Sequence, residues 1–280
     1  MIKSIEEVLE RASKLPERRV AVAAAHDEDV MEAVCKAGEM NIANFILIGD
    51  SERIERMAED NGFAGHFEIV NAESDADCAR QAVRLASIGE AGCIMKGQLS
   101  TAEMMRAVID KEHGIRTEGL ISHTMFYEVP AYHKLLCITD GGMNPAPDMD
   151  RKVQILENAA QTLIKLGYEH INASCLCGAE LVNPKIQSTV DAAAIAEMTE
   201  RWGKYNMNVI GPVALDLAIS SRACEHKGYS APGCGDADIL LVPCYEVGNS
   251  MGKAMTYFAN AKSAGMIVGA KMPIILTSRA

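Results

Sequence analysis

Two residues at the end of the chain, Ser278 and Arg279, stand where they could do chemistry. They follow an apolar run that begins after Pro273, and such a run is typical of a buried strand in a parallel sheet. The carboxyl ends of parallel strands open into the ligand crevice of an α/β sheet. A hydroxyl and a guanidinium there predict contact with a substrate, whereas a frayed terminus that only meets water is the alternative interpretation.

A second candidate is the stretch "MKGQLSTAEMMRAVI". We expect Lys96 and Gly97 to end a strand, and Ser100 or Thr101 to cap the following helix, which carries Arg106. Free N–H groups and the positive end of a helix dipole favour a bound anion, and glycine lets the backbone come close. The stretch predicts an anion site, although many turns of this kind contain Gly and Ser for structural reasons alone.

A similar arrangement occurs in "PCYEVGNSMGKAMTYF", where we expect a strand to end at Pro243 and a helix to begin at Asn249. Asn249 and Lys253 are four residues apart and share one face of that helix, and Gly248 comes directly before it. The stretch predicts ligand contacts. Its alternative interpretation is a helix cap followed by a solvated lysine.

Two more loops at expected strand ends carry carboxylates. "ITDGGMNPAPD" contains Asp140 and Asn144, and "GPVALDLAIS" places Asp216 near a helix start, where a carboxylate also stabilises the helix dipole. His123 and His133 flank an expected hairpin turn, where hydrogen bonding alone would account for them. The sequence has no Ser/His/Asp or Cys/His order and no nucleotide-binding glycine fingerprint, which disfavours dinucleotide and nucleoside triphosphate enzymes.

The nine cysteines are scattered, mostly within apolar runs, and therefore indicate reduced core thiols. Cys175 and Cys177 have a C-x-C spacing that could hold a soft metal. They lack a second Cys or His pair at zinc-ligand spacing, and alternate residues of a strand point to opposite faces. No metal site is predicted.

The composition favours a helix-covered parallel sheet, because hydrophobic residues make up 49% of the 280-residue chain and aromatic residues only 5%. The net charge of −11 argues against nucleic acid or an anionic membrane surface as a partner, since both need clustered Lys and Arg. No run approaches the ~20 apolar residues of a membrane span, and the charged, amphipathic start is neither a signal peptide nor an anchor. We therefore expect a cytoplasmic protein.

The elements that must position these residues follow a regular order. Strand-like and helix-like stretches alternate four times over about residues 1–116, which predicts a parallel sheet with helices on both faces. "LISHTMFYEVPAYHKLLCITD" then offers two strand-like runs and a short turn, and predicts a hairpin. Alternation resumes with helices expected over Asp150–Leu166 and Ser188–Lys204, so we place a domain boundary near Glu118.

Together these stretches resemble the phosphate acyltransferases, the family of phosphate acetyltransferase and phosphate butyryltransferase. The resemblance is carried in order by "SHTMFYEVPAYHKLLCITDGGMNPAPD", "CGAELVNPKIQSTVDA", "GPVALDLAIS", "GDADILLVP", "GNSMGKAMTYFA" and "IVGAKMPIILTSRA". "YHKLL", "VNPKIQ" and "GAKMPIILTSR" resemble the butyryl branch more closely. The resemblance implies two α/β/α domains with mostly parallel sheets and an interdomain cleft, as in isocitrate and isopropylmalate dehydrogenases. The implied first domain comprises residues 1–118 plus 277–280, and the second comprises residues 119–276.

The resemblance also implies reversible transfer of a short acyl group from butyryl-CoA to phosphate by direct displacement, with CoA and phosphate as substrates and no tightly bound cofactor. Such a reaction needs a cation for phosphate and donors for the developing oxyanion. Arg279 is then expected to hold phosphate through a bidentate fork, and Ser278 to donate to the oxyanion or to sulfur. Arg106 is expected to contact phosphate or a CoA phosphate. The remaining family positions are expected to line the cleft: Lys96, Gly97, Ser100, Thr101, Asp140, Asn144, Gly248, Asn249 and Lys253. A homodimer or higher homo-oligomer is also implied.

Family members continue past the Ser-Arg pair into a terminal helix, which in the acetyl branch carries an acidic residue proposed to deprotonate the thiol. This chain stops at Ala280, and we expect that further residues follow in the full protein. Otherwise Asp140 or Asp216 would have to take that role, or the protein would be impaired. Three alternative functions stay open: an acetyl-preferring enzyme, a metal- and NAD-dependent dehydrogenase of the same architecture, and a non-catalytic sensor of CoA or acyl phosphate.

Overall fold

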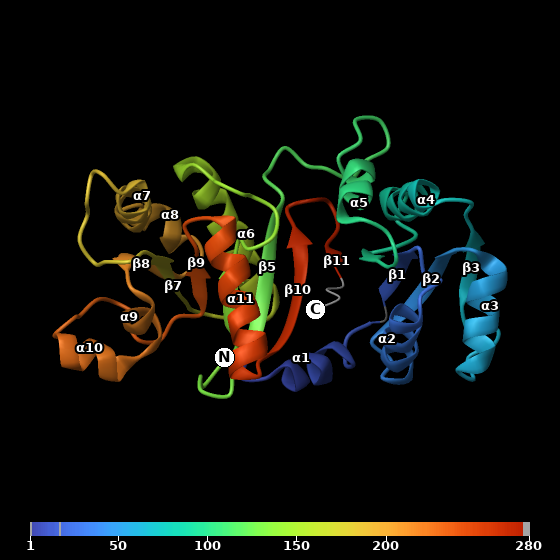
Figure 1. Cartoon of the computed structure of the whole chain (residues 1–280), viewed down its shortest axis with the longest axis horizontal. Helices are drawn as coiled ribbons and strands as arrows, with labels where there is room; N and C mark the ends of the chain where they lie inside the picture. Colours follow the sequence, from blue (N-terminus) through green and yellow to red (C-terminus); the bar gives the residue numbers. More distant parts are fainter. Residues whose placement is uncertain (1, 17, 277–280) are drawn as a thin grey trace. The chain divides into compact units, whose positions relative to one another are not determined.

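The computed structural model describes residues 2–16 and 18–276, and strands and helices alternate along most of this part of the chain (Figure 1). The chain forms two compact units. The 9–119 unit comprises Leu9–Gly119 with Met266–Ala280, and the 120–265 unit comprises Met1–Val8 with Leu120–Gly265. The chain returns to the 9–119 unit within β10, whereas the sequence-based division makes that return only at residue 277. The predicted α/β class is confirmed.

The 9–119 unit has five parallel strands in the order β3-β2-β1-β4-β11. The last strand comes from the far end of the chain and pairs Leu276 with Lys96 of β4. Three helices connect the other strands, and a fourth follows β4. The bounds are β1 (Arg18–Ala23), α2 (Glu28–Glu39), β2 (Ala43–Gly49), α3 (Ser51–Asp60), β3 (Glu68–Asn71), α4 (Asp75–Ser87), β4 (Cys93–Lys96), α5 (Thr101–Val108) and β11 (Ile274–Leu276).

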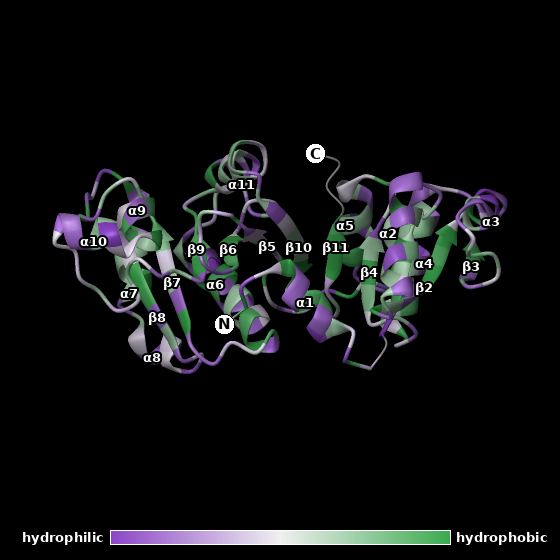
Figure 2. Ribbon diagram, turned by 90° about the horizontal axis from the view of Figure 1, so that it is seen from below, coloured by the Kyte–Doolittle hydropathy of each residue, from purple (hydrophilic) through white to green (hydrophobic). Residues whose placement is uncertain are grey.

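These helices begin where short polar side chains offer caps. Asp27, Asp50, Ser74 and Ser100 each accept a hydrogen bond from a backbone N–H in the first turn of the helix that follows. The apolar faces of α2 and α3 then pack on one face of the sheet, against strand residues that include Val22. In Figure 2 the strands β2 and β4 are mostly hydrophobic, and α3 is largely hydrophilic. Local caps and burial of an apolar face together fix this unit.

The 120–265 unit has the strand order β5-β6-β9-β7-β8. β5 and β6 form the predicted antiparallel hairpin, and β6, β9, β7 and β8 run parallel. β10 contributes its first residues to this unit. Helix α1 (Ile5–Ala12) begins in this unit and ends in the other. The remaining bounds are β5 (Ser122–Glu128), β6 (Leu136–Thr139), α6 (Met149–Lys165), β7 (Ile171–Leu176), α7 (Gln187–Ala196), α8 (Thr199–Gly203), β8 (Met207–Val213), α9 (Leu215–Ile219), α10 (Ser221–Lys227), β9 (Ile239–Leu241), α11 (Tyr245–Ala259) and β10 (Lys262–Val268).

Two hydrophobic layers cover the two faces of this sheet. One layer packs α6 and the buried Trp202 of α8 against alternate strand residues such as Cys137 and Ile239. The other packs α9, α10 and α11 against the intervening residues, such as Ile138 and Leu240. Alternation of side chains along a strand produces both layers, and the strands read as nearly continuous apolar runs for that reason.

Two helix predictions for this unit need correction, and one helix was not predicted. The helix expected over Ser188–Lys204 is two helices, because α7 ends at Ala196 and α8 begins at Thr199. The helix expected to begin at Asn249 is α11, which begins at Tyr245 without any side-chain cap, so the sequence offers no capping signal. The short helix α10 was not predicted, and it follows α9 directly, with Ser220 as its cap.

Candidate active site

The loops that follow β6 and β9 lie together at one edge of the 120–265 unit. These strands are parallel neighbours, so their carboxyl ends meet at the same edge. Asn249 Nδ2 donates to the carbonyl of Gly141 at 3.4 Å, and the N–H of Tyr245 donates to the carbonyl of Pro145 at 3.0 Å. Two of the predicted stretches, one around Asp140 and one around Asn249, are therefore adjacent in space.

Asp140 is the centre of the loop after β6 and is only 2% exposed. Its Oδ1 accepts the N–H groups of Gly142 and Met143 at 2.7 and 2.8 Å. Its Oδ2 accepts Nδ2 of Asn144 at 2.6 Å and the N–H of His123 at 3.1 Å. Each carboxylate oxygen thus has two donors, which suits a residue that fixes a loop better than one that accepts a proton from substrate.

Helix α11 approaches this loop through glycine. A Cβ on Gly248 would lie 2.8 Å from the Cα of Gly141, and a Cβ on Gly252 would lie 2.1 Å from the hydroxyl of Tyr127. Gly248 and Gly252 are buried, and Asn249 lies beside them in the second turn of the helix. Lys253 is exposed on α11. The small residues let the helix backbone contact the loop that Asp140 holds.

Lys96 occupies the corresponding carboxyl edge of the 9–119 unit. It is 7% exposed, and its Nζ donates to the carbonyls of Gly97 at 3.1 Å and Leu99 at 2.9 Å. Its β4 position pairs with Leu276, the last described residue of β11. Ser278 and Arg279 lie outside the described residues.

The turn after Lys96 only partly matches its predicted role. The N–H of Gly97 is not free for an anion, because it donates to the carbonyl of Ala23 at 2.8 Å. A Cβ on Gly97 would lie 2.2 Å from the carbonyl oxygen of Ala24, so glycine is required there by the neighbouring backbone. Ser100 caps α5 as predicted, Thr101 is the first helical residue, and Arg106 is exposed in the last turn.

Asp216, the second carboxylate considered for proton transfer, is engaged in an ion pair. Its Oδ2 lies 2.8 Å from Nζ of Lys227. The hydrogen bond from Lys227 lowers the pKa of Asp216 below its ordinary value, and the positive charge of that lysine acts in the same direction. Its carboxylate is therefore a weaker base than an isolated aspartate.

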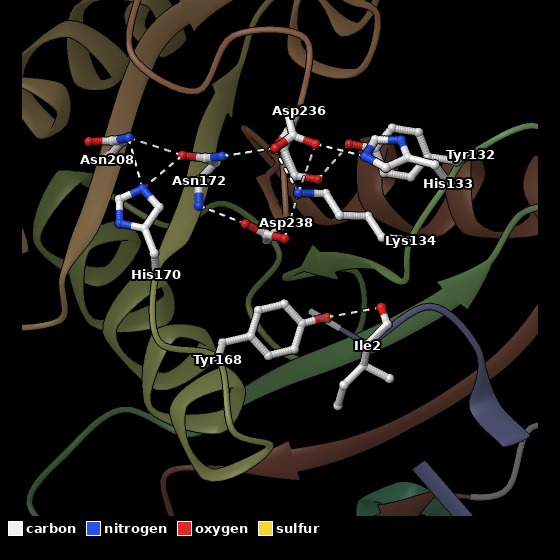
Figure 3. Close-up of polar contacts among 11 residues, drawn as sticks. Ile2, Tyr132, His133, Lys134, Tyr168, His170, Asn172, Asn208, Asp236 and Asp238 are labelled. Atoms are coloured by element: carbon white, nitrogen blue, oxygen red, sulfur yellow. Dashed lines mark hydrogen bonds and ion pairs between the residues drawn. The ribbon is translucent and has the colours of Figure 1, made fainter. Parts of the chain in front are cut away.

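A second polar cluster lies at the opposite edge, where β9, β7 and β8 begin (Figure 3). Lys134 is fully buried there, with its Nζ 2.7 Å from Asp238 and 3.1 Å from Asp236. His133 Nε2 contacts Asp236 at 2.8 Å, and Nδ2 of Asn172 donates to the same aspartate at 3.2 Å. These charges are paired and lie away from the carboxyl ends of the strands. The cluster therefore stabilises the packing of neighbouring strands where they begin. Sequence reasoning missed it, since its members are far apart along the chain.

A surface cavity of about 420 Å³ lies in the 9–119 unit at the side of α3 and the start of β3. Its lining includes Glu55, Glu59, Phe63 and Phe67. Both glutamates are exposed, and the cavity does not include any residue of the Lys96 turn. We therefore do not place the chemistry there.

The described residues contain no group of three or more His, Cys, Asp or Glu arranged to hold a metal ion. None of the helices in residues 2–16 and 18–276 is both long and apolar enough to cross a membrane.

A family model described as "Phosphate acetyl/butaryl transferase" matches residues 3–86 and 67–280. A phosphate butyryltransferase of Clostridium acetobutylicum is 40% identical over 281 residues, which cover 100% of this chain and 93% of that protein. This chain belongs to the phosphate acetyl/butyryl transferase family. A phosphate acetyltransferase of Rickettsia prowazekii is 39% identical over 275 residues, covering 98% of this chain and 78% of that protein.

Solved structures agree with this assignment. A branched-chain phosphotransacylase from Enterococcus faecalis V583 superposes with a TM-score of 0.85 at 34% identity, and the match covers 94% of this chain and 92% of that one. A putative 4-hydroxythreonine-4-phosphate dehydrogenase from Salmonella typhimurium shares the fold, with a TM-score of 0.60 at 12% identity over 95% of this chain and 92% of that one. The predicted dehydrogenase-like architecture is confirmed.

Proposed function

We propose that this protein transfers a short acyl group between coenzyme A and inorganic phosphate, and that butyryl is the preferred group. The observation that carries the proposal is the 40% identity with a phosphate butyryltransferase over the whole chain. A phosphate acetyltransferase is almost equally similar, so the choice of acyl group is the part of the proposal that most needs a test. One methylene in an apolar pocket changes specificity by only ~1–3 kcal/mol.

In the proposed reaction, an oxygen of hydrogen phosphate attacks the thioester carbonyl carbon. The C–O bond forms, the C–S bond breaks, and the proton that leaves phosphate ends on the sulfur of CoA. The transition state carries negative charge on phosphate and on the carbonyl oxygen, so it needs a cation and hydrogen-bond donors. Arg279 is the proposed cation and Ser278 the proposed donor. Chain length supports their placement beside the Lys96 turn, because Leu276 pairs with Lys96 and the chain spans at most about 7 Å to Ser278 and about 11 Å to Arg279.

We further propose that the substrate-binding side chains are Arg106, Ser100, Thr101, Asn249 and Lys253, with Lys96, Gly97, Asp140, Asn144 and Gly248 holding the loops that carry them. The contacts described above support this division. Arg106 and Lys253 are exposed cations on helices that begin at the two carboxyl edges. Lys96 and Asp140 instead have their polar atoms bonded within their own loops.

Displacement without an acyl-enzyme is also part of the proposal. Burial raises the thiol pKa of most cysteines, to about 12 for Cys93, which suits packing better than nucleophilic attack. Cys244, which directly precedes α11 at the candidate site, is the cysteine to exclude. Intact mass measurement after mixing with butyryl-CoA in phosphate-free buffer should show no acyl adduct. An adduct that disappears in Cys244→Ala would overturn direct displacement.

The function is tested by free thiol release from butyryl-CoA and from acetyl-CoA, each with and without phosphate. We expect release that depends on phosphate and has the higher kcat/KM with butyryl-CoA. A higher value with acetyl-CoA would overturn the acyl preference alone. Binding of CoA without any phosphate-dependent release would overturn the enzymatic proposal in favour of a sensor.

A further inference from the structure

His123 lies at the candidate site although it was not among the residues predicted for it. It is the second residue of β5, which runs antiparallel to β6, so it stands at the carboxyl end of β6. Its backbone N–H donates to Asp140 Oδ2 at 3.1 Å, and its carbonyl accepts the hydroxyl of Thr139 at 2.8 Å. The backbone of His123 is therefore held by the same aspartate that organises the loop after β6.

The two ring nitrogens of His123 have different surroundings. Nδ1 is buried and has no hydrogen-bond partner among the described residues. Gly142 covers this side of the ring, since a Cβ there would lie 2.6 Å from Nδ1 and 2.8 Å from Cγ. The residue as a whole is half-buried. Nε2 has no hydrogen-bond partner in the described part of the chain, and unlike Nδ1 it is not fully buried. Nε2 is therefore the nitrogen that solvent or a substrate can reach.

This asymmetry selects one protonation state. A buried N–H without an acceptor is rarer in proteins than an under-used acceptor, which favours the neutral tautomer with its proton on Nε2. The imidazolium would place an unpaired N–H at Nδ1 and is disfavoured for the same reason. Burial lowers the pKa of His123 accordingly, although the negative charge of Asp140 acts in the opposite direction. The ring is thus a neutral donor at neutral pH.

We propose that His123 is a further catalytic residue whose Nε2–H donates a hydrogen bond to an anionic oxygen of the substrates. This inference rests on the proposed function. The proton stays on Nε2, so His123 stabilises charge and does not act as an acid or a base. A neutral imidazole can serve as an electrophile in this way. The carboxylates considered for catalysis do not compete for the role, because Asp140 already has four donors and Asp216 is paired with Lys227.

Two substitutions separate the two nitrogens. The amide of His123→Gln reaches the position of Nε2, and the shorter amide of His123→Asn reaches only that of Nδ1. If Nε2 donates to substrate, kcat should fall about 100-fold in H123N, as when one oxyanion donor is removed, and H123Q should retain most of it. Melting temperatures of both variants control for folding. Wild-type kcat in a stably folded H123N, or equal losses in both variants, would overturn the proposal.

A second measurement does not depend on turnover. Long-range ¹H–¹⁵N spectra of the wild-type histidine rings, assigned with H123Q, report the tautomer directly and are titrated with phosphate and, separately, with CoA. We expect the Nε2–H tautomer and a saturable shift of Nε2 with at least one of them. An Nδ1–H tautomer, or no response to either, would overturn the proposal. A response without any acyl transfer would reject the proposed function but keep His123 as an anion donor. Normal turnover in H123N would reject only the role of His123.

Discussion

Gly248 of α11 and Gly141 of the loop after β6 touch through their backbones. A Cβ on Gly248 would lie 2.8 Å from the Cα of Gly141 and 2.9 Å from Cγ2 of Val242. The same loop holds Asp140 and Asn144, and α11 carries Asn249. The two predicted site stretches, one around Asp140 and one around Asn249, can therefore lie this close only because residue 248 is glycine.

Gly248→Ala should destabilise the protein and weaken catalysis. The added methyl group forces the helix and the loop apart, and overpacking of this kind costs about 1–3 kcal/mol. Urea denaturation gives the change in the free energy of unfolding, and thiol release gives kcat/KM. Gly38→Ala in α2 is the matched control, since its Cβ would meet nothing within 4 Å. Equal behaviour of the two variants would contradict the proposed contact.

Lys134→Met should destabilise the protein strongly and leave substrate KM unchanged. It removes the cation shared by Asp236 and Asp238, and an unpaired buried charge costs about 3–5 kcal/mol. KM should not change, because the cluster lies at the strand starts and not at the carboxyl edge. Lys227→Met, which breaks a surface pair, is the control and should have little effect on stability. A large KM change in a folded Lys134 variant would contradict this separation.

Acid should destabilise the wild-type protein more than His123→Gln. The pKa of His123 is lowered in the folded state, so the unfolded state takes up its proton first. The contribution of the neutral ring is fully present above the unfolded pKa of about 6.5, and it is lost as the pH falls from there through the folded pKa. Glutamine does not titrate, and Asp140 is present in both proteins. The check is the free energy of unfolding of both proteins, measured between about pH 7.5 and about pH 5. Parallel curves for the two proteins would show that the ring is not buried.

Arg279→Lys should weaken phosphate use, because lysine keeps the charge but loses the bidentate fork. Loss of one hydrogen bond to a charged group is worth about 1.5–3 kcal/mol, so kcat/KM for phosphate should fall roughly 10- to 100-fold. Arg53→Lys on the exposed surface of α3 controls for the substitution itself. Wild-type kinetics with phosphate in the Arg279 variant would exclude the assigned role.

Sequence patterns predicted the alternating fold well where local signals exist. The cap at Ser100 and the apolar runs of β1 and β2 act within a few residues, and the elements they predict are present. The start of α11 was misplaced because Cys244 supplies no capping side chain. The pairing of β11 with β4 joins residues about 180 positions apart, and the sequence-based division left β11 in the second domain.

Only part of the site was predicted, because local signals again account for the residues that were found. Asp140 and Asn249 stood out as polar residues at strand ends, which is a local property. The requirement for glycine at position 97 comes from the carbonyl of Ala24, a contact between the turns that follow β4 and β1. His123 resembled a hairpin residue, and only the burial of its Nδ1 against Gly142 distinguishes it. Contacts between distant segments leave no signature in a single sequence.

Formation of an acyl phosphate tests the central proposal most directly. The protein is incubated with butyryl-CoA and inorganic phosphate while ³¹P NMR follows the phosphorus species and a thiol reagent follows CoA. We predict a new acyl phosphate signal that grows in equal amount with free CoA and is absent without enzyme. Release of CoA without that signal, or at the same rate without phosphate, would contradict it.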